Sequence, residues 1–317
     1  MSSKRIRVAN FNITFDPDRS PMLDHFEDAI YPALRSQYRR NEKNAVYYFD
    51  DIRLKVINGR FALSGMLIKD TEYNIKTVVK NGRLVNESHR VPTAPYSRFV
   101  VMLDSHRMAL VQNEGYSPDI RSFQATLRGA LSTYRSKTNK ARSNQPDCTR
   151  VPKADVNVIE MTRRGEIHQI LEDFDRISEL KLRFFPLNGD FDNNDFLEMM
   201  RSSLGKLGTT RGHFRATSPE NVSEVEDLTE DAMRMGTVAA TISGKGKSGE
   251  NLVYSDSKIK STHYIVLEGN VGADDDGYII NEAVSQGFDL GASGSNLALY
   301  GRTVALLQGL LDRQEHQ

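Results

Sequence analysis

The chain has 317 residues, of which 38% are hydrophobic and 26% charged, a composition that is typical of a globular protein and excludes a largely disordered one. No apolar run approaches the roughly 18–20 residues that a membrane-spanning helix needs. The net charge is zero, but the charges are unevenly distributed along the chain. Residues 1–150 contain 25 Lys and Arg and 15 Asp and Glu, whereas residues 151–317 contain 17 Lys and Arg and 27 Asp and Glu. This division predicts that the halves meet different partners: a polyanion on the basic half, the opposite half of a second copy, or each other within one chain.

The first part of the chain predicts a strand, a helix and an antiparallel meander. Residues 4–15 alternate between apolar and polar side chains, as a strand does, and the N-terminus lacks the apolar segment of a signal peptide. Apolar residues at helical spacing predict a helix over 21–37. A run of strands follows, with hairpin turns expected at Asn58-Gly59, at Asn81-Gly82 and near 104–106.

The clearest predicted helix spans residues 117–142. Ser117 is expected to be its N-cap and Pro118 to occupy its first helical position. Its apolar stripe consists of Ile120, Phe123, Leu127, Leu131 and Tyr134. Arginines recur on it every seven residues, so they form one slowly winding line of positive charge. That line contains Arg121, Arg128, Arg135 and Arg142, with Lys137 and Lys140 near its end.

This arginine line is the best candidate for a binding site. Guanidinium groups about 10 Å apart along a helix axis can follow a phosphate backbone, and such contacts give affinity without reading the sequence of the nucleic acid. A solvated helix face and a surface for an acidic protein are the alternatives. The pattern therefore predicts nucleic acid as a partner and leaves both alternatives open.

Pro146 and Pro152 bracket a predicted boundary, with a basic α+β domain over residues 1–148 and an acidic one over 149–317. Cys148, the single cysteine, lies in this linker, so no internal disulfide is possible and a reducing, cytoplasmic setting is expected. In the second domain strands alternate with helices, and a hairpin and a C-terminal helix follow. The order predicts an α+β fold in which the N-terminal domain is an antiparallel meander with helices and the C-terminal one a ferredoxin-like layer.

The stretch TISGKGKSGE (241–250) resembles a phosphate-binding loop, since it contains Gly-Lys-Ser. The first glycine of that motif would fall on Thr241, and strand-like segments flank the stretch where a strand and a helix are needed. A β-hairpin is therefore predicted. Its Lys245 and Lys247 are candidate phosphate contacts, and a solvated turn is the alternative.

Motifs for metal binding or catalysis are incomplete. Residues 189–196 begin like an EF-hand but lack the glycine and glutamate that its loop requires, and 272–278 reads as a charged turn. Glu179 and Lys181 fit the E-x-K of some metal-dependent nucleases, with Asp155 as a possible third residue, which leaves a nuclease as an alternative. The motifs H-E-x-x-H, C-x-x-C and G-x-S-x-G do not occur. We expect no catalytic residue, metal or cofactor.

The order of elements carries a family resemblance. A short opening strand and a helix precede the meander around YYFDDIRLKVINGRFALSGMLI, the hairpin SRFVVMLDSHRMALVQNEG and the arginine-rich helix, and the second half contains SELKLRFFPL and the paired strands TVAATISGKGKSG and HYIVLEGN. Their order resembles the RexA-type phage-exclusion proteins and related uncharacterised defence-associated families. The resemblance implies a non-enzymatic homodimer that binds DNA without sequence preference in antiphage defence or phage exclusion. The alternative is a scaffold subunit of a defence complex, whose basic and acidic halves pair with a second copy or with an effector.

Overall fold

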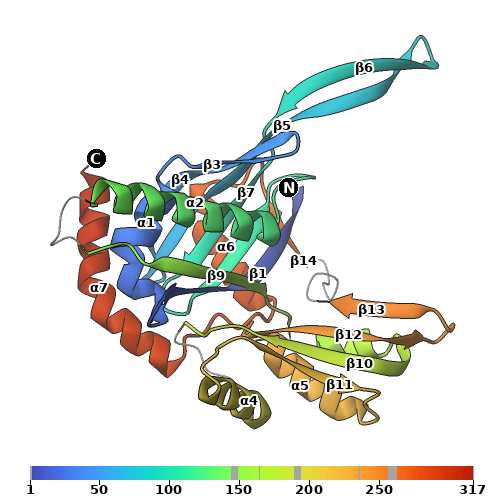
Figure 1. The fold of residues 1–317 in the computed structure, drawn as a ribbon. Helices are drawn as coiled ribbons and strands as arrows, with labels where there is room; N and C mark the ends of the chain where they lie inside the picture. The colour runs from blue at the N-terminus through green and yellow to red at the C-terminus, as the bar shows by residue number, and fades with distance from the viewer. Residues whose placement is uncertain are drawn as a thin grey trace.

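The protein has an α+β fold with two antiparallel sheets, as predicted (Figure 1). The computed structural model describes residues 2–143, 149–163, 165–188, 194–234, 236–255 and 263–316. Within these ranges ten strands form the first sheet and four form the second. No helix in the described ranges is long and apolar enough to cross a membrane.

The first sheet is organised around its long N-terminal strand, β1 (Ser2–Asp16). One edge of β1 pairs with β8, and the chain of pairings continues through β7, β5 and β4 to β3. The other edge pairs first with β14 and then with β9, while a two-residue strand, β2, pairs near its end. The bounds are β2 (Ser20–Pro21), β3 (Arg39–Glu42), β4 (Ala45–Ile57), β5 (Arg60–Lys80), β6 (Arg83–Thr93), β7 (Tyr96–Met102), β8 (Arg107–Gln112), β9 (Lys153–Glu160) and β14 (His263–Leu267).

Both faces of the first sheet are covered, so its central strands are apolar on both sides. On β7, Phe99 and Val101 join one core cluster and Val100 and Met102 join the other, because successive side chains of a strand point to opposite faces. Helices α2 (Ile120–Ala141) and α7 (Gly294–Glu315) contribute to the first cluster, and α6 (Asp276–Ser285) contributes to the second. This double cover explains the continuous apolar run FVVML in the sequence.

The second sheet is covered on one face only. Its order is β11 (Gly212–Thr217), β10 (Phe174–Phe184), β12 (Val238–Gly246) and β13 (Asn251–Ser255). Its buried side chains pack with those of α3 (Glu166–Leu171), α4 (Asp195–Lys206) and α5 (Val222–Arg234). Strands β11 and β12 flank β10 antiparallel to it and are joined through α5. A ferredoxin-like layer stays a prediction, and the strand expected to open it, ADVNVIEM (154–161), lies in the first sheet as β9.

The two sheets do not divide the chain at residues 148 and 149. From the second half, β9 and β14 pair with β1, and α6 and α7 pack on the first sheet. Polarity patterns mark segments as strands, but pairing partners depend on which strand edges need hydrogen bonds in the folded chain. The acidic half of the sequence therefore contributes to both sheets.

Two predicted helices differ in detail from expectation. The one predicted over 21–37 is helical over 22–34, but as a 3-10 helix, η1 (Met22–His25), a π-helix, η2 (Phe26–Ile30), and a short α-helix, α1 (Tyr31–Leu34). Pro32 lies in the first turn of α1, where its missing N–H does not disrupt the helix. The N-cap of α2 is Asp119, whose side chain accepts a hydrogen bond from the Ser122 N–H at 2.8 Å. The hydroxyl of Ser117 instead accepts a hydrogen bond from the Glu114 N–H.

Candidate nucleic-acid interface

The arginine line of α2 is held in place by the buried opposite face of the helix. Phe123 is fully buried, and its ring centroid lies 4.9 Å from that of Phe99 and 5.3 Å from that of Phe49. Leu127 and Leu131 continue this stripe, as predicted. Because the apolar face fixes the rotation of α2, Arg121 and Arg128 are exposed.

Side chains of α2 also form hydrogen bonds with the backbone of β9 along its outer edge. One edge of β9 pairs with β1 along its whole length. On the other edge, the Gln124 side-chain oxygen accepts a hydrogen bond from the Val158 N–H at 2.7 Å, and Arg128 Nη2 donates to the Val156 carbonyl at 2.6 Å. These two contacts fix α2 alongside β9 and hold the Arg128 guanidinium over the space between α2 and the second sheet.

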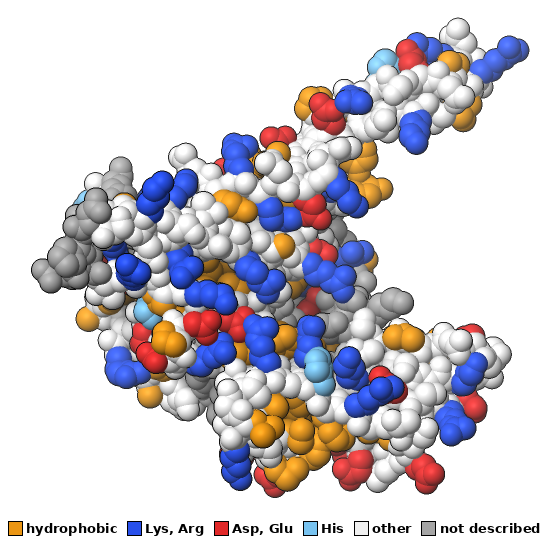
Figure 2. Space-filling model, in the orientation of Figure 1, with side chains coloured by type: hydrophobic (Ala, Val, Ile, Leu, Met, Phe, Trp, Pro, Cys, Tyr) orange, Lys and Arg blue, Asp and Glu red, His pale blue; other side chains and the backbone are white. Residues whose placement is uncertain are grey.

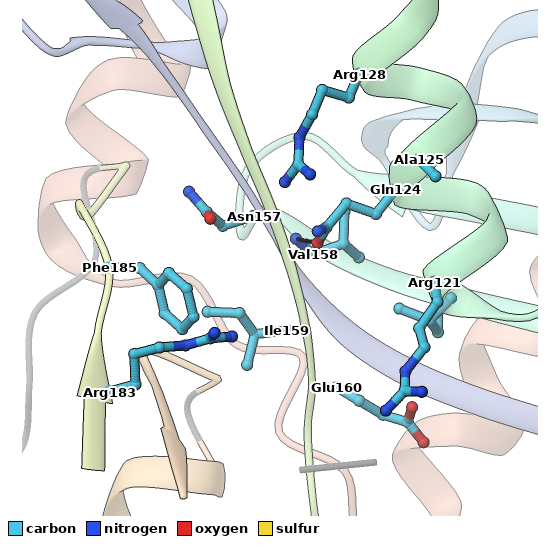
Figure 3. A pocket seen from close by; sticks show the side chains of 11 residues that line it. Arg121, Gln124, Ala125, Arg128, Asn157, Val158, Ile159, Glu160, Arg183 and Phe185 are labelled. Atoms are coloured by element: carbon cyan, nitrogen blue, oxygen red, sulfur yellow. Dashed lines mark hydrogen bonds between the residues drawn. The ribbon is translucent and has the colours of Figure 1, made fainter. Parts of the chain in front are cut away.

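A pocket of about 490 Å³ lies between α2, β9 and the end of β10. Figure 3 shows Arg121 and Arg128 pointing from α2 toward the pocket, with Arg183 pointing in from the opposite wall. A second pocket of about 410 Å³ also has Arg128 in its lining, so the hollow continues along the helix. We call the two pockets together the α2 groove. Its cationic lining residues are Arg121, Arg128, Arg135, Lys153, Arg183 and Arg211.

The two carboxylates of the α2 groove already have cationic partners. Glu160 accepts from Arg7 Nη1 at 2.6 Å. Asp155 forms an ion pair with Arg211 and lies 3.6 Å from Arg19. Since positive charge exceeds negative charge among the lining residues, the groove is suited to bind an anion.

The second sheet extends this positive surface on its uncovered face. Lys181 is paired in register with Arg215, and Arg183 with His213, so the four side chains share one face of β10 and β11. The guanidinium of Arg183 stacks on the ring of Phe185, 4.6 Å from the ring centroid. Figure 2 shows Lys and Arg side chains over α2 and over the facing part of the second sheet. The basic surface thus has two walls on separate elements.

The predicted site residues are only partly brought together. Arg121, Arg128 and Arg135 line the α2 groove. Lys137 and Lys140 are exposed on the last turns of α2, and Arg142 donates to the Thr149 carbonyl at 2.7 Å. Lys245 and Lys247 are exposed on the hairpin of β12 and β13 and do not line the groove.

Sequence reasoning missed Lys153 on β9 and the wall formed by the second sheet, which carries Arg183 and Arg211. The three residues come from separate segments of the half that carries net negative charge. The alternation of basic and apolar residues in LKLRFF and RGHFR was a usable signal, since alternate residues of a strand share a face. This alternation could have indicated one basic face on each strand, but not that α2 lies opposite.

The hairpin predicted for 241–250 is confirmed. Strands β12 and β13 pair antiparallel, and Gly249 adopts a positive φ of 83° in the turn. Since a strand rather than a helix follows the glycines, the N–H groups of a helix N-terminus are not aligned there for a phosphate.

The proposed nuclease geometry is not present. Asp155 lies on β9, which pairs with β1 in the first sheet rather than with β10, and Glu179 forms an ion pair with Arg215. Among the described residues no group of three His, Cys, Asp or Glu is placed to hold a metal. Asp276, expected in a solvated turn, is buried and bonded to Arg98 Nε at 2.8 Å. Asp190, Asp192 and Cys148 lie outside the described residues.

Comparison with models of known protein families found no match, and a search of curated proteins found no relative.

Proposed function

We propose that the protein binds DNA through the sugar–phosphate backbone, with the α2 groove and the adjoining face of β10 and β11 as the contact surface. The observation that carries this proposal is the convergence of arginines from two walls on one groove, with its two carboxylates already paired. Backbone contacts of this kind are made by Arg and Lys and do not depend on the base sequence.

The dimensions of the surface support a nucleic acid over a small anion. From Arg121 to Arg135 the helix axis rises by about 21 Å, which is more than half of one turn of B-form DNA, about 34–36 Å. Arg183 and Arg211 on the opposite wall extend the surface across the groove. A ligand with many phosphates at regular spacing would use all of these side chains together.

A non-enzymatic role in the cytoplasm, in antiphage defence or phage exclusion, forms part of this proposal and rests on the resemblance to the RexA-type proteins. The resemblance also implies a homodimer. A scaffold function, in which basic and acidic surfaces pair between proteins, is the competing interpretation.

The test is a titration of purified protein against a plain DNA duplex and a single strand of equal length, at 50 mM and 200 mM salt. We expect tight binding at the lower salt that weakens steeply at the higher salt. The variant Arg128→Glu/Arg135→Glu should lose binding, while Lys206→Glu/Arg302→Glu, with the same charge change on the exposed surfaces of α4 and α7, should retain it. Absence of binding by the unaltered protein at 50 mM salt would overturn the proposal.

A further inference from the structure

The first pocket of the α2 groove, about 490 Å³ in volume, has the size and the mixed lining of a small-molecule site. Pockets that hold small ligands are typically about 300–1,000 Å³ and combine apolar walls with a few polar groups. A site for phosphate alone needs only cations, but Ile159 and Phe185 also line this pocket and share a buried apolar cluster. The pocket is therefore suited to a ligand that has a planar, partly apolar group beside its anionic group.

Arg183 offers a flat surface to this pocket. Its guanidinium lies over the Phe185 ring, 4.6 Å from the ring centroid, and Figure 3 shows the two side chains together, with Arg183 directed toward the pocket. Since Arg183 is exposed, the side of the guanidinium plane away from the ring can receive a ligand. Nucleic-acid bases stack on Arg guanidinium planes as they do on aromatic rings, and the N–H groups at the edge of the same guanidinium can still donate to a phosphate.

Two carboxamide side chains supply hydrogen-bonding groups for the edge of a base. The Gln124 oxygen accepts from the Val158 N–H at 2.7 Å, so the amide nitrogen is the group that this side chain can offer to a ligand. Asn157 lines the same pocket although it is only 5% exposed, and its amide nitrogen donates to Asp155 Oδ1 at 3.2 Å, so its oxygen can serve as an acceptor. A donor and an acceptor on neighbouring side chains match the edges of bases, which present both kinds of group.

We propose that this pocket holds one nucleotide, with its base stacked on Arg183 and its phosphate bound by Arg121 and Arg128 of α2. The nucleotide is either an unpaired one in DNA that lies along the α2 groove or a free one from solution, and the same chemistry recognises both. A base inside a duplex is stacked on its neighbours, so only an unpaired or extruded base can enter. For a nucleotide within DNA the inference rests on the proposed function and extends it, because the protein then prefers DNA with unpaired positions.

The first test compares two single strands that differ only in their bases. One is a thymine strand of about 12 nucleotides, and the other has the same backbone with a stable abasic analogue at each position. Loss of one stacked base weakens binding by about tenfold or more, so the abasic strand should bind the unaltered protein at least about tenfold more weakly at 50 mM salt. Both strands carry the same phosphates, so the slopes of log K against log salt should agree.

The variant Arg183→Lys tests the stacking surface, since it keeps the positive charge but loses the guanidinium plane. Arg183 is exposed, so the change does not disturb the core. The variant should bind the base-bearing and abasic strands about equally, with the salt slope of the unaltered protein. The matched control Arg121→Lys makes the same exchange on the opposite wall of the pocket, and it should keep the preference for the base-bearing strand.

A second measurement separates the two sources of the nucleotide. Isothermal calorimetry compares thymidine 5′-monophosphate with inorganic phosphate at equal ionic strength, and the nucleotide should bind about tenfold more tightly. Base dependence in the strand assay assigns the site to unpaired DNA. Base dependence with the free nucleotide alone assigns it to a nucleotide from solution.

Two results would overturn the proposal. One is equal affinity for the base-bearing and abasic strands together with equal affinity for thymidine 5′-monophosphate and phosphate, which would make the pocket a site for phosphate alone. The other is a base preference that survives unchanged in Arg183→Lys. Salt-sensitive DNA binding without any base dependence would retain the proposed function and remove the nucleotide within DNA. If the protein binds no DNA, the calorimetric comparison decides for or against the nucleotide pocket by itself.

Discussion

Neutralising one arginine on each wall of the α2 groove should change the salt dependence of DNA binding by a calculable amount. The variant is Arg121→Gln/Arg183→Gln, in which both changed residues line the same pocket from opposite sides. Each phosphate contact contributes about −0.9 to the slope of log K against log salt on duplex DNA. Six contacts, one for each cationic side chain of the groove, give a slope of about −5.4, and removal of two reduces it to about −3.6.

These slopes predict a difference that is large enough to measure. Between 50 and 200 mM salt, the unaltered protein should lose affinity by about 2,000-fold and the variant by about 150-fold. The assay is fluorescence anisotropy with a labelled duplex of about 30 base pairs, three turns of the helix. The control Lys206→Gln/Arg302→Gln removes the same charge from the exposed surfaces of α4 and α7, and its slope should match that of the unaltered protein.

The result that would refute the reasoning is an unchanged slope in Arg121→Gln/Arg183→Gln. Equal slopes would mean that these two guanidinium groups contact no phosphate, whatever the affinity. A reduction of about 0.9 would mean that only one wall contacts DNA. A reduction that appears equally in the control would reflect net charge rather than the α2 groove.

Three further predictions concern the hairpin, the helix anchor and pH. Lys245→Gln/Lys247→Gln should lower DNA affinity less than Arg121→Gln/Arg183→Gln in the same titration, because these lysines lie outside the α2 groove; an equal loss would extend the contact surface to the hairpin. Phe123→Ala should lower the free energy of unfolding in urea by about 3–5 kcal/mol, because its buried ring anchors α2; a loss below 1 kcal/mol, about that of an ordinary substitution, would contradict this. The hydrogen bond to Glu226, the charge of Glu226 and that of Glu172 raise the pKa of His168 despite some desolvation. The His168 contribution to stability should therefore be complete below about pH 6.5 and fade as the pH rises through the raised pKa, so the difference in Tm between wild type and His168→Gln should shrink at alkaline pH.

Local patterns in the sequence correctly identified the elements that depend on neighbouring residues. The apolar stripe of α2 is buried as predicted, and the turns at Asn58-Gly59 and Asn81-Gly82 join hairpin strands in the structure. The N-cap of α2 was predicted wrongly because two nearby residues are almost equally suited to that position. Ser117 and Asp119 are both good capping residues, and only the path of the chain before α2 decided for Asp119.

The sequence by itself determined the α+β class, the spacing of the arginines on α2 and the alternation that makes β10 and β11 basic on one face. These properties follow from the period of about 3.6 residues in a helix and of two residues in a strand, which can be applied to a sequence directly. Only the tertiary structure decided that β9 and β14 join β1, and that Arg183 and Arg211 face α2 across a groove. Long-range pairing depends on which edges and apolar faces must be covered when the whole chain has folded, and this information is distributed over segments far apart in the sequence.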